Sequence, residues 1–208
     1  MDSKTKQYSN EKLIIFDMIG TLTTNPHLIS QIFYLTFPSA DIPEVKKYYE
    51  DYKVDKIDRK TFWNGVGFEN FSTQEARFLG NISLKQGVLD MLKDLKEDYK
   101  LALFSNIPKE WGHYMQDTFG FKEIFDAIIF SGDYGIQKPD SEIYEILLSK
   151  FQDINPGNMY FVDDDLEDLE TGKKYLMNTI WLESDQLAGG YRPDYVIQDI
   201  FEIINIVK

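Results

Sequence analysis

The chain has 208 residues, a length that suits one average domain with a subdomain or two small domains. Its formal net charge of −13 argues against nucleic acid or an anionic membrane as the main partner. The absence of cysteine excludes disulfides, zinc–thiolate sites and a cysteine nucleophile. No apolar run approaches the ~20 residues that span a membrane, and the polar segment 1–12 lacks the apolar centre of a secretory signal. We therefore expect a cytoplasmic protein, either a monomer or a homodimer.

The first strong element is an unbroken apolar run at residues 13–16, which stops at the carboxylate of Asp17. A short apolar run bounded by a turn predicts a strand that is buried on both faces, as in a parallel sheet. Gly20 and Thr21 then supply a tight polar turn. Open α/β sheets bind their ligands at the carboxyl ends of such strands. Asp17 is therefore a candidate functional residue, with a turn cap as the alternative for this neighbourhood taken alone.

Residues 24–83 carry helix signals and no convincing strand. An amphipathic pattern covers 45–52, and the segments that begin at Asp58 and Ser72 open further helices. This block therefore predicts a small helical insertion. Its aromatic side chains are expected to form the interior of that insertion: Tyr48, Tyr49, Tyr52, Phe62 and Trp63.

From residue 84 onward, strand and helix patterns alternate. Apolar runs predict strands at 101–104, 127–130, 159–162, 179–182 and 195–197. Amphipathic patterns predict helices at 88–95, 111–119, 142–151, 167–175 and 200–207. Strands that alternate with helices are typical of an α/β fold with a Rossmann-like, doubly wound parallel sheet. The predicted organisation is a core domain formed by residues 1–23 and 84–208, with an α-helical cap domain, 24–83, inserted into it.

Three of the predicted strands end in polar residues that can meet at one edge of the sheet. These ends are Asp17, the Ser-Asn pair at 105–106 and the three aspartates at 163–165. A loop lysine, Lys138, stands just before a proline and a predicted helix. Carboxylates hold a hard divalent cation through oxygen, most naturally Mg²⁺. A hydroxyl and a lysine can bind a phosphoryl oxygen while Asp17 attacks phosphorus to form an aspartyl phosphate.

In these segments the chain resembles the haloacid dehalogenase superfamily over nearly its whole length. FDMIGTLT resembles the first motif of that family, which has the form D-x-D-G-T-L in most of its phosphatases. LFSN resembles the second motif, GIQKPDSEIY the third and YFVDDDLEDLETGKKYLM the fourth. The helical insertion lies where the family has its first type of cap. The resemblance implies a Rossmann-like core with a helical cap and a hydrolase that acts on a small phosphorylated metabolite.

The resemblance also implies roles for the matching residues. Asp17 matches the nucleophile, and Lys138 matches the lysine that neutralises the nucleophile and the phosphoryl group. Ser105 matches the phosphate ligand of the second motif. The expected contacts to phosphate or substrate are Ser105, Asn106, Gly20 and Thr21.

A magnesium site is implied by the same resemblance. Asp163 and Asp164 match the acidic pair of the fourth motif. With Asp17 and the backbone carbonyl of Ile19, they are expected to hold Mg²⁺. Asp168 lies in the same motif without a secure match.

Ile19 is the main departure from the family pattern. The family's phosphatases usually carry a second aspartate at this position, which protonates the leaving alkoxide and activates the hydrolytic water. An isoleucine cannot transfer a proton, and general acid–base catalysis is typically worth about 10² to 10⁴ in rate. The sequence therefore predicts intact metal and phosphate binding with one proton-transfer role missing.

Three explanations of Ile19 stay open. The chain can be a phosphatase that manages without the aspartate, like the short-cap relatives that resemble glucose-1-phosphate phosphatases. It would then favour a good leaving group or take the proton from elsewhere, for example from His27 or a cap residue. It can be a 2-haloacid dehalogenase, although those enzymes lack a metal and the acidic run 163–165 speaks against this. It can also be a weak or inactive relative retained for binding, or Ile19 can be an engineered change. The phosphatase is the interpretation that we favour.

Overall fold

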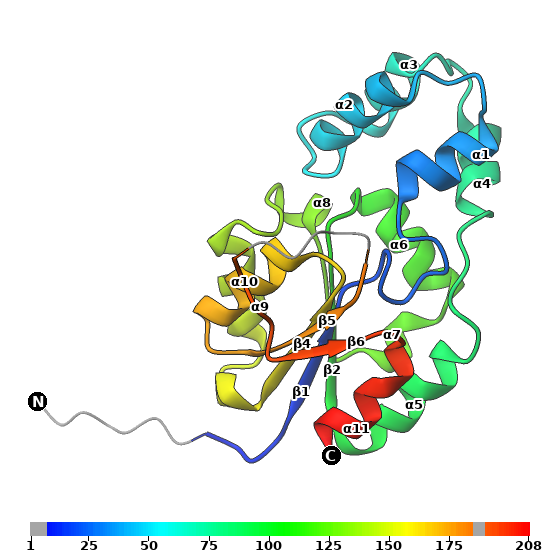
Figure 1. Cartoon of the computed structure of the whole chain (residues 1–208). Coiled ribbons are helices and arrows are strands. Elements are labelled where there is room, and N and C mark those ends of the chain that lie inside the picture. The colour runs from blue at the N-terminus through cyan, green and yellow to red at the C-terminus, as the bar shows by residue number, and fades with distance from the viewer. Residues whose placement is uncertain (1–7, 185–189) are drawn as a thin grey trace, which may run out of the picture.

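The computed structural model describes residues 8–184 and 190–208. Its centre is a parallel sheet in the order β3-β2-β1-β4-β5-β6 (Figure 1). The strands are β1 (Leu13–Phe16), β2 (Lys100–Ser105), β3 (Ala127–Phe130), β4 (Met159–Asp163), β5 (Asn178–Leu182) and β6 (Tyr195–Ile197). This order confirms the predicted doubly wound α/β fold. Residues 1–7, part of the predicted polar segment, lie outside the described residues.

The central strand β1 is buried along its whole length. Leu13 and Ile15 belong to the core cluster on one face of the sheet, whereas Ile14 and Phe16 belong to the cluster on the other. Successive side chains of a strand point to opposite faces. Because both faces are covered, every residue of β1 must be apolar, which explains the unbroken run in the sequence.

Helices cover both faces of the sheet (Figure 1). They are α5 (Val88–Asp98), α6 (Lys109–Thr118), α7 (Phe121–Ile124), α8 (Ser131–Tyr134), α9 (Ser141–Lys150), α10 (Leu166–Lys174) and α11 (Ile203–Val207), with 3₁₀ turns at η2 (Pro156–Asn158) and η3 (Ile200–Glu202). The predicted helix at 200–207 is therefore a 3₁₀ turn followed by an α-helix. The helices α7 and α8 were not predicted, because a four-residue helix is too short to show a hydrophobic period.

The chain between β1 and α5 forms a helical insertion beyond the end of the sheet to which β1 points (Figure 1). Its elements are the π-helix η1 (Leu28–Phe33), α1 (Tyr34–Thr36), α2 (Ile42–Tyr52), α3 (Arg59–Gly65) and α4 (Ser72–Leu79). Asp58 caps α3, as predicted, because its Oδ1 accepts the Thr61 N–H at 2.7 Å. The predicted start of a helix at Ser72 is also confirmed.

The two chain segments that connect the insertion to the rest of the chain lie side by side. Thr23 and Leu84 form an isolated antiparallel bridge, and the Thr24 N–H donates to the Ser83 carbonyl oxygen at 2.9 Å. The boundaries predicted for the cap, 24–83, fall at this bridge. The division of the chain into two domains remains a prediction.

Aromatic side chains fill the interior of the insertion, as expected for Tyr52, Phe62 and Trp63, which are fully buried. The Trp63 ring stacks on Phe33 of η1 with centroids 5.7 Å apart. Trp111 of α6 also enters this group from the sheet side. Within the described part of the chain, no helix has the length and apolar character that crossing a membrane requires.

Candidate active site

The carboxyl ends of β2, β1 and β4 lie side by side, because these strands are neighbours in the sheet. Asp17 follows β1, whereas Ser105 ends β2 and Asp163 ends β4. All three side chains are buried. The Ser105 hydroxyl donates to Oδ1 of Asp17 at 3.0 Å. The structure thus brings together polar side chains that the sequence places at three separate strand ends.

Lys138 lies at the centre of this group, in the loop before α9. Its Nζ is 3.0 Å from Asp17 Oδ1, 2.5 Å from Asp163 Oδ2 and 3.1 Å from Asp168 Oδ2. The side chain of Lys138 is only 1% exposed. An ammonium has three N–H donors, so each donor has its own carboxylate acceptor. Asp168, whose role the sequence left open, is therefore a direct partner of Lys138.

The side chain of Asn106 fixes the backbone of Lys138. Its Nδ2 donates to the Lys138 carbonyl oxygen at 2.9 Å, and its Oδ1 accepts the Lys138 N–H at 2.8 Å. Both ends of the amide are thus used to position the lysine. This pairing joins the loop after β2 to the loop before α9.

Burial and mutual repulsion shift the ionisation of these groups. Burial alone lowers the pKa of Lys138, but the charges of Asp163, Asp17 and Asp168 outweigh it, and that pKa lies well above its usual value. Burial raises the pKa of Asp163 well above its usual range. Burial and the nearby Asp17 charge raise the pKa of Asp164 to about 7, and burial raises the pKa of Asp168 to about 6. One ammonium among four carboxyl groups leaves excess negative charge in the absence of a second cation.

The excess charge coincides with a set of oxygen donors. Carboxylate oxygens of Asp17, Asp163 and Asp164 lie within 4.8 Å of one another. Hard oxygen ligands of this kind suit Mg²⁺ or Ca²⁺. The donor set therefore fits the magnesium ion that the family resemblance implies.

The turn after Asp17 requires a glycine at Gly20. Its φ is +89°, and a Cβ atom there would lie 2.4 Å from Oδ2 of Asp164. The Gly20 N–H donates to Thr23 Oγ1 at 2.9 Å, so this N–H is already used within the turn. Thr21 is completely buried, and its Oγ1 has no hydrogen-bond partner among the described residues.

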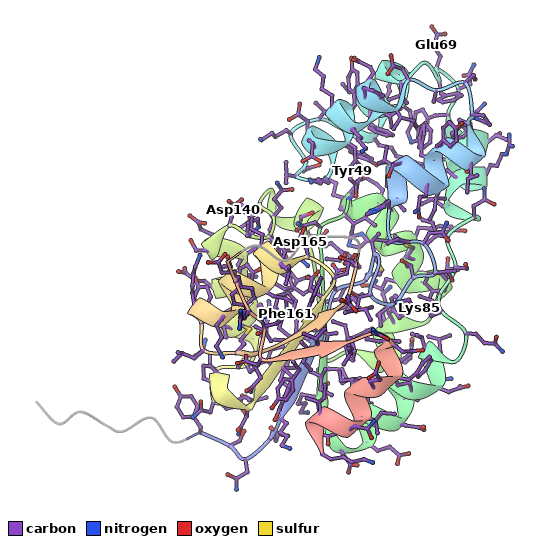
Figure 2. All side chains as sticks on the ribbon, viewed as in Figure 1. Tyr49, Glu69, Lys85, Asp140, Phe161 and Asp165 are labelled. Atoms are coloured by element: carbon purple, nitrogen blue, oxygen red, sulfur yellow. The ribbon has the colours of Figure 1, made fainter. Side chains whose placement is uncertain are left out.

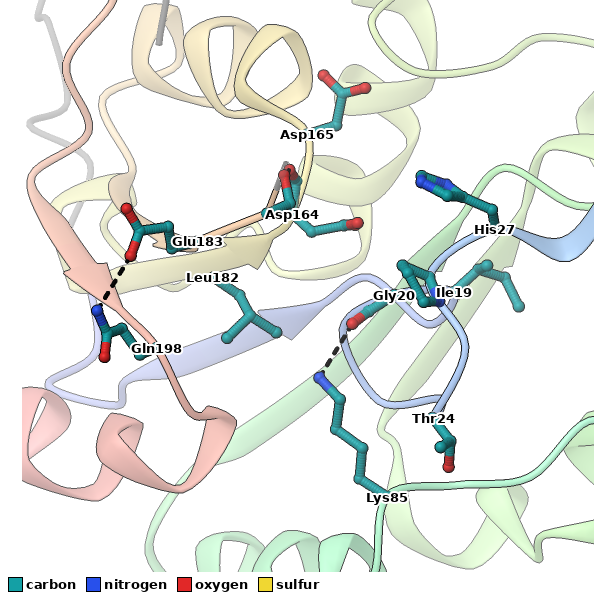
Figure 3. A pocket seen from close by; sticks show the side chains of 12 residues that line it. Ile19, Gly20, Thr24, His27, Lys85, Asp164, Asp165, Leu182, Glu183 and Gln198 are labelled. Carbon is teal, nitrogen blue, oxygen red and sulfur yellow. Dashed lines mark hydrogen bonds between the residues drawn. The ribbon is translucent and has the colours of Figure 1, made fainter. Parts of the chain in front are cut away.

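Lys85 holds the same turn from outside and was missed by the sequence analysis. Its Nζ donates to the carbonyl oxygen of Gly20 at 3.0 Å (Figure 3) and to that of Thr21 at 2.9 Å. Burial lowers the pKa of Lys85. Nothing in its local sequence indicates this role, because the bonds join residues that are 65 and 64 positions apart in the chain.

A cavity of about 710 Å³ opens beside the turn. Its wall includes Ile19, His27, Asp164, Glu183 and Gln198. Figure 3 shows the His27 imidazole on the same side as Asp164, next to the turn that carries Ile19. The position two residues after Asp17 thus borders a space large enough for a small metabolite.

The helical insertion reaches the site through α2. Figure 2 shows Tyr49 on the side of the insertion that faces the sheet. Its hydroxyl donates to the Asn106 carbonyl oxygen at 3.4 Å, and its ring stacks on Trp111 with centroids 5.8 Å apart. Tyr49 was expected in the interior of the insertion, but it is half-buried and lies over the core, because α2 docks on α6.

Comparison with known proteins agrees with this geometry. A family model described as a haloacid dehalogenase-like hydrolase matches residues 11–175. The chain is 26% identical over 209 residues to the pyrophosphatase PpaX of Oceanobacillus iheyensis. That alignment covers 94% of this chain and 96% of the relative.

Solved structures of this family share the fold. A HAD phosphatase from Thermococcus onnurineus matches with a TM-score of 0.72 and 20% identity, over 94% of this chain and 97% of that one. A HAD family enzyme from Bacteroides thetaiotaomicron, in complex with magnesium and inorganic phosphate, matches with a TM-score of 0.69 and 18% identity, over 86% of this chain and 97% of that one. By its matched residues and its fold, the chain belongs to the haloacid dehalogenase-like hydrolases.

Proposed function

We propose that this protein is a magnesium-dependent phosphatase of a small phosphorylated metabolite that works through an aspartyl phosphate on Asp17. The observation that carries the proposal is the position of the Asp17 carboxylate. It accepts hydrogen bonds from Ser105 and Lys138, and one of its oxygens lies within 4.8 Å of carboxylate oxygens of Asp163 and Asp164. The relative from Oceanobacillus iheyensis, which is named a pyrophosphatase, and the magnesium and phosphate bound by the neighbour from Bacteroides thetaiotaomicron support it.

In this proposal Asp17 is the nucleophile. Its carboxylate forms a bond to phosphorus as the leaving oxygen departs, and water then hydrolyses the resulting acyl phosphate. The Ser105 hydroxyl binds a phosphoryl oxygen, and the Lys138 ammonium neutralises charge on the nucleophile and on the phosphoryl group. Lys138 is held in place for this role by its three carboxylate partners.

Asp17, Asp163, Asp164 and the backbone carbonyl of Ile19 would hold Mg²⁺. Bound there, the ion would supply positive charge to the phosphoryl oxygens. The turn formed by Gly20 and Thr21 would shape this side of the site.

Asn106 is assigned a positioning role. Both ends of its amide bond to the backbone of Lys138, so its side chain acts on the phosphoryl group through that lysine. An Asn106→Ala variant should therefore lower kcat more than it changes KM, because the lysine loses its fixed position.

The test is hydrolysis of p-nitrophenyl phosphate with and without Mg²⁺. We expect activity that requires Mg²⁺ and falls at least ~10³-fold in Asp17→Asn, because loss of a covalent nucleophile leaves only positioning and electrostatic effects. The exposed carboxylate of Asp90 provides a matched control, and Asp90→Asn should retain activity. Equal activity of the Asp17→Asn and unchanged proteins would contradict the proposal.

Ile19 favours one second candidate, a protein that keeps the site for binding and turns over little or no substrate. Calorimetric binding of phosphate in the presence of Mg²⁺, without hydrolysis of p-nitrophenyl phosphate or of a panel of sugar phosphates, would support that candidate. Release of halide from 2-chloropropionate without metal would indicate the dehalogenase instead.

A further inference from the structure

The side chain two residues after the nucleophile borders the cavity but carries no proton. Ile19 lines the cavity of about 710 Å³ together with Asp164 and His27. A leaving group held in this cavity therefore meets an aliphatic side chain at the position of Ile19. Protonation of that group would have to come from another residue.

The proton-bearing side chains in contact with Asp17 are already engaged. The single hydroxyl proton of Ser105 is donated to Asp17 Oδ1. The three N–H donors of Lys138 face Asp17, Asp163 and Asp168. Donating a proton to a leaving group would break the ion pairs that hold this buried lysine. Neither residue is therefore placed to act as a general acid.

Two further donors close to Lys138 and Asn106 are engaged with the backbone as well. One N–H of the Asn106 side-chain amide donates to the Lys138 carbonyl oxygen, and the hydroxyl of Tyr49 donates to the Asn106 carbonyl oxygen. In each case the donor is bonded to a backbone carbonyl oxygen of the site. Both groups can thus shape the space above Asp17 without supplying a proton to the reaction.

His27 is the one imidazole on the wall of the cavity (among residues 8–184 and 190–208). Its side chain is exposed, and it makes no capping hydrogen bond to η1, the helix that it precedes. A general acid must be held within hydrogen-bond reach of the atom that it protonates. Among the residues that the structure describes, no side-chain hydrogen bond fixes the His27 ring in such a position.

We infer that the substrates of this site are phosphates whose leaving group departs without being protonated, acyl phosphates above all. This inference rests on the proposed function and names the substrate class for the same site. In the first step, the Asp17 carboxylate bonds to phosphorus while the bond from phosphorus to the leaving oxygen breaks. That oxygen departs with the electron pair as a carboxylate. Water then attacks phosphorus, which restores Asp17, releases inorganic phosphate and passes one proton to phosphate or solvent.

The experiment compares three substrates of similar bulk: benzoyl phosphate, phenyl phosphate and benzyl phosphate. Their leaving groups are a carboxylate, a phenolate and an alkoxide, in order of rising basicity. With Mg²⁺ present, kcat/KM should fall in this order, by at least ~10² from benzoyl to benzyl phosphate, because a missing general acid costs about 10² to 10⁴ in rate.

Variants then test whether the lack of a general acid causes the difference in kcat/KM between the substrates. Ile19→Asp should raise the ratio of kcat/KM on benzyl phosphate to kcat/KM on benzoyl phosphate at least ~10-fold, because of the two leaving groups only the alkoxide needs a proton. The asparagine of Ile19→Asn has the same shape as an aspartate but carries no acidic proton. This variant should therefore give no rise in kcat/KM on benzyl phosphate. His27→Gln should leave the ratio between the two substrates as it is in the unchanged protein.

The outcomes separate this inference from the proposed function. Similar kcat/KM on benzoyl and benzyl phosphate would overturn the inference and leave the phosphatase standing. A selective loss of benzyl phosphate hydrolysis in His27→Gln would also overturn it, because the imidazole would then be the acid. No phosphate release from any of the three would instead refute the phosphatase itself. The comparison in the unchanged protein decides the inference even if a variant fails to fold.

Discussion

Nε1 of Trp111 in α6 donates to Oε1 of Glu75 in α4 at 2.9 Å, and Nε1 of Trp63 in α3 donates to the same oxygen at 3.1 Å. Arg59 pairs with the other carboxylate oxygen. Glu75 is only 3% exposed. One buried carboxylate thus joins the helical insertion to α6, a helix beside the sheet.

Glu75→Ala should lower the free energy of unfolding by at least about 2 kcal/mol, because two buried indole N–H groups lose their acceptor. Urea unfolding followed by tryptophan fluorescence measures this change. Glu69→Ala, at the exposed far end of the insertion (Figure 2), is the control and should stay within about 0.5 kcal/mol of the unchanged protein. A loss no larger than that of the control would show that water replaces the carboxylate.

Lys138→Met should destabilise the protein by about 3–5 kcal/mol in buffer without divalent metal, because three buried carboxylates lose their cation. The double variant Lys138→Met/Asp168→Asn should lose less, since one of the repelling charges is gone. Denaturant unfolding in the presence of EDTA checks both. The exposed Lys150 gives the control, and Lys150→Met should change little. Equal losses in the single and double variants would contradict the charge argument.

Mg²⁺ should raise the melting temperature, because an ion that binds only the folded state stabilises it, by about 2.7 kcal/mol at a hundred times its Kd. Asp164→Asn should move the midpoint of this titration at least ~10-fold higher in Mg²⁺, since one of the three clustered carboxylates is lost. Thermal unfolding across a Mg²⁺ series measures the midpoint independently of activity. A midpoint unchanged from that of Asp90→Asn would place the ion elsewhere.

The ionised carboxylate of Asp126 should make the stability of the folded protein fall at acidic pH. Burial disfavours its ionised form, but the Leu101 N–H and the ammonium groups of Lys96 and Lys100 outweigh this, so the pKa of Asp126 lies below its usual value. Its contribution to stability is therefore present above the unfolded-state pKa and lost as pH falls through the lower folded-state pKa. Urea unfolding between about pH 5 and pH 3 should show a smaller loss of stability in Asp126→Asn than in the unchanged protein. Parallel curves for the two proteins would refute the prediction.

The sheet and the residues at its carboxyl edge were predictable, because their signals are local. Burial of β1 on both faces demands four apolar residues in a row, and the polar residue that ends each buried strand marks where the strand leaves the core. Because β2 and β4 flank β1, the residues at the ends of these strands lie close together: Asp17, Ser105 and Asp163.

The groups that support the site were not predictable in the same way. The local sequence around Lys85 is typical of a surface lysine, and that around Glu75 is typical of an exposed acidic residue of an amphipathic helix. Each acquires its role from a segment that is distant in the sequence, the Gly20 turn for Lys85 and Trp111 for Glu75. Patterns of apolar spacing describe which face of an element is buried, but they do not say against which partner it docks.

The central place of β1 has a consequence for how the protein is made. Leu13 pairs with Lys100 on one side and with Met159 on the other. Because β1 precedes both neighbours in the chain, it stays unpaired on one side until β4 has been synthesised. Such long-range pairing slows folding and exposes apolar strands to aggregation. Shortened chains that end before residue 159 would keep Asp17 but leave one edge of its strand open. Asp17 is thus synthesised well before the aspartates that follow β4 and that complete its surroundings.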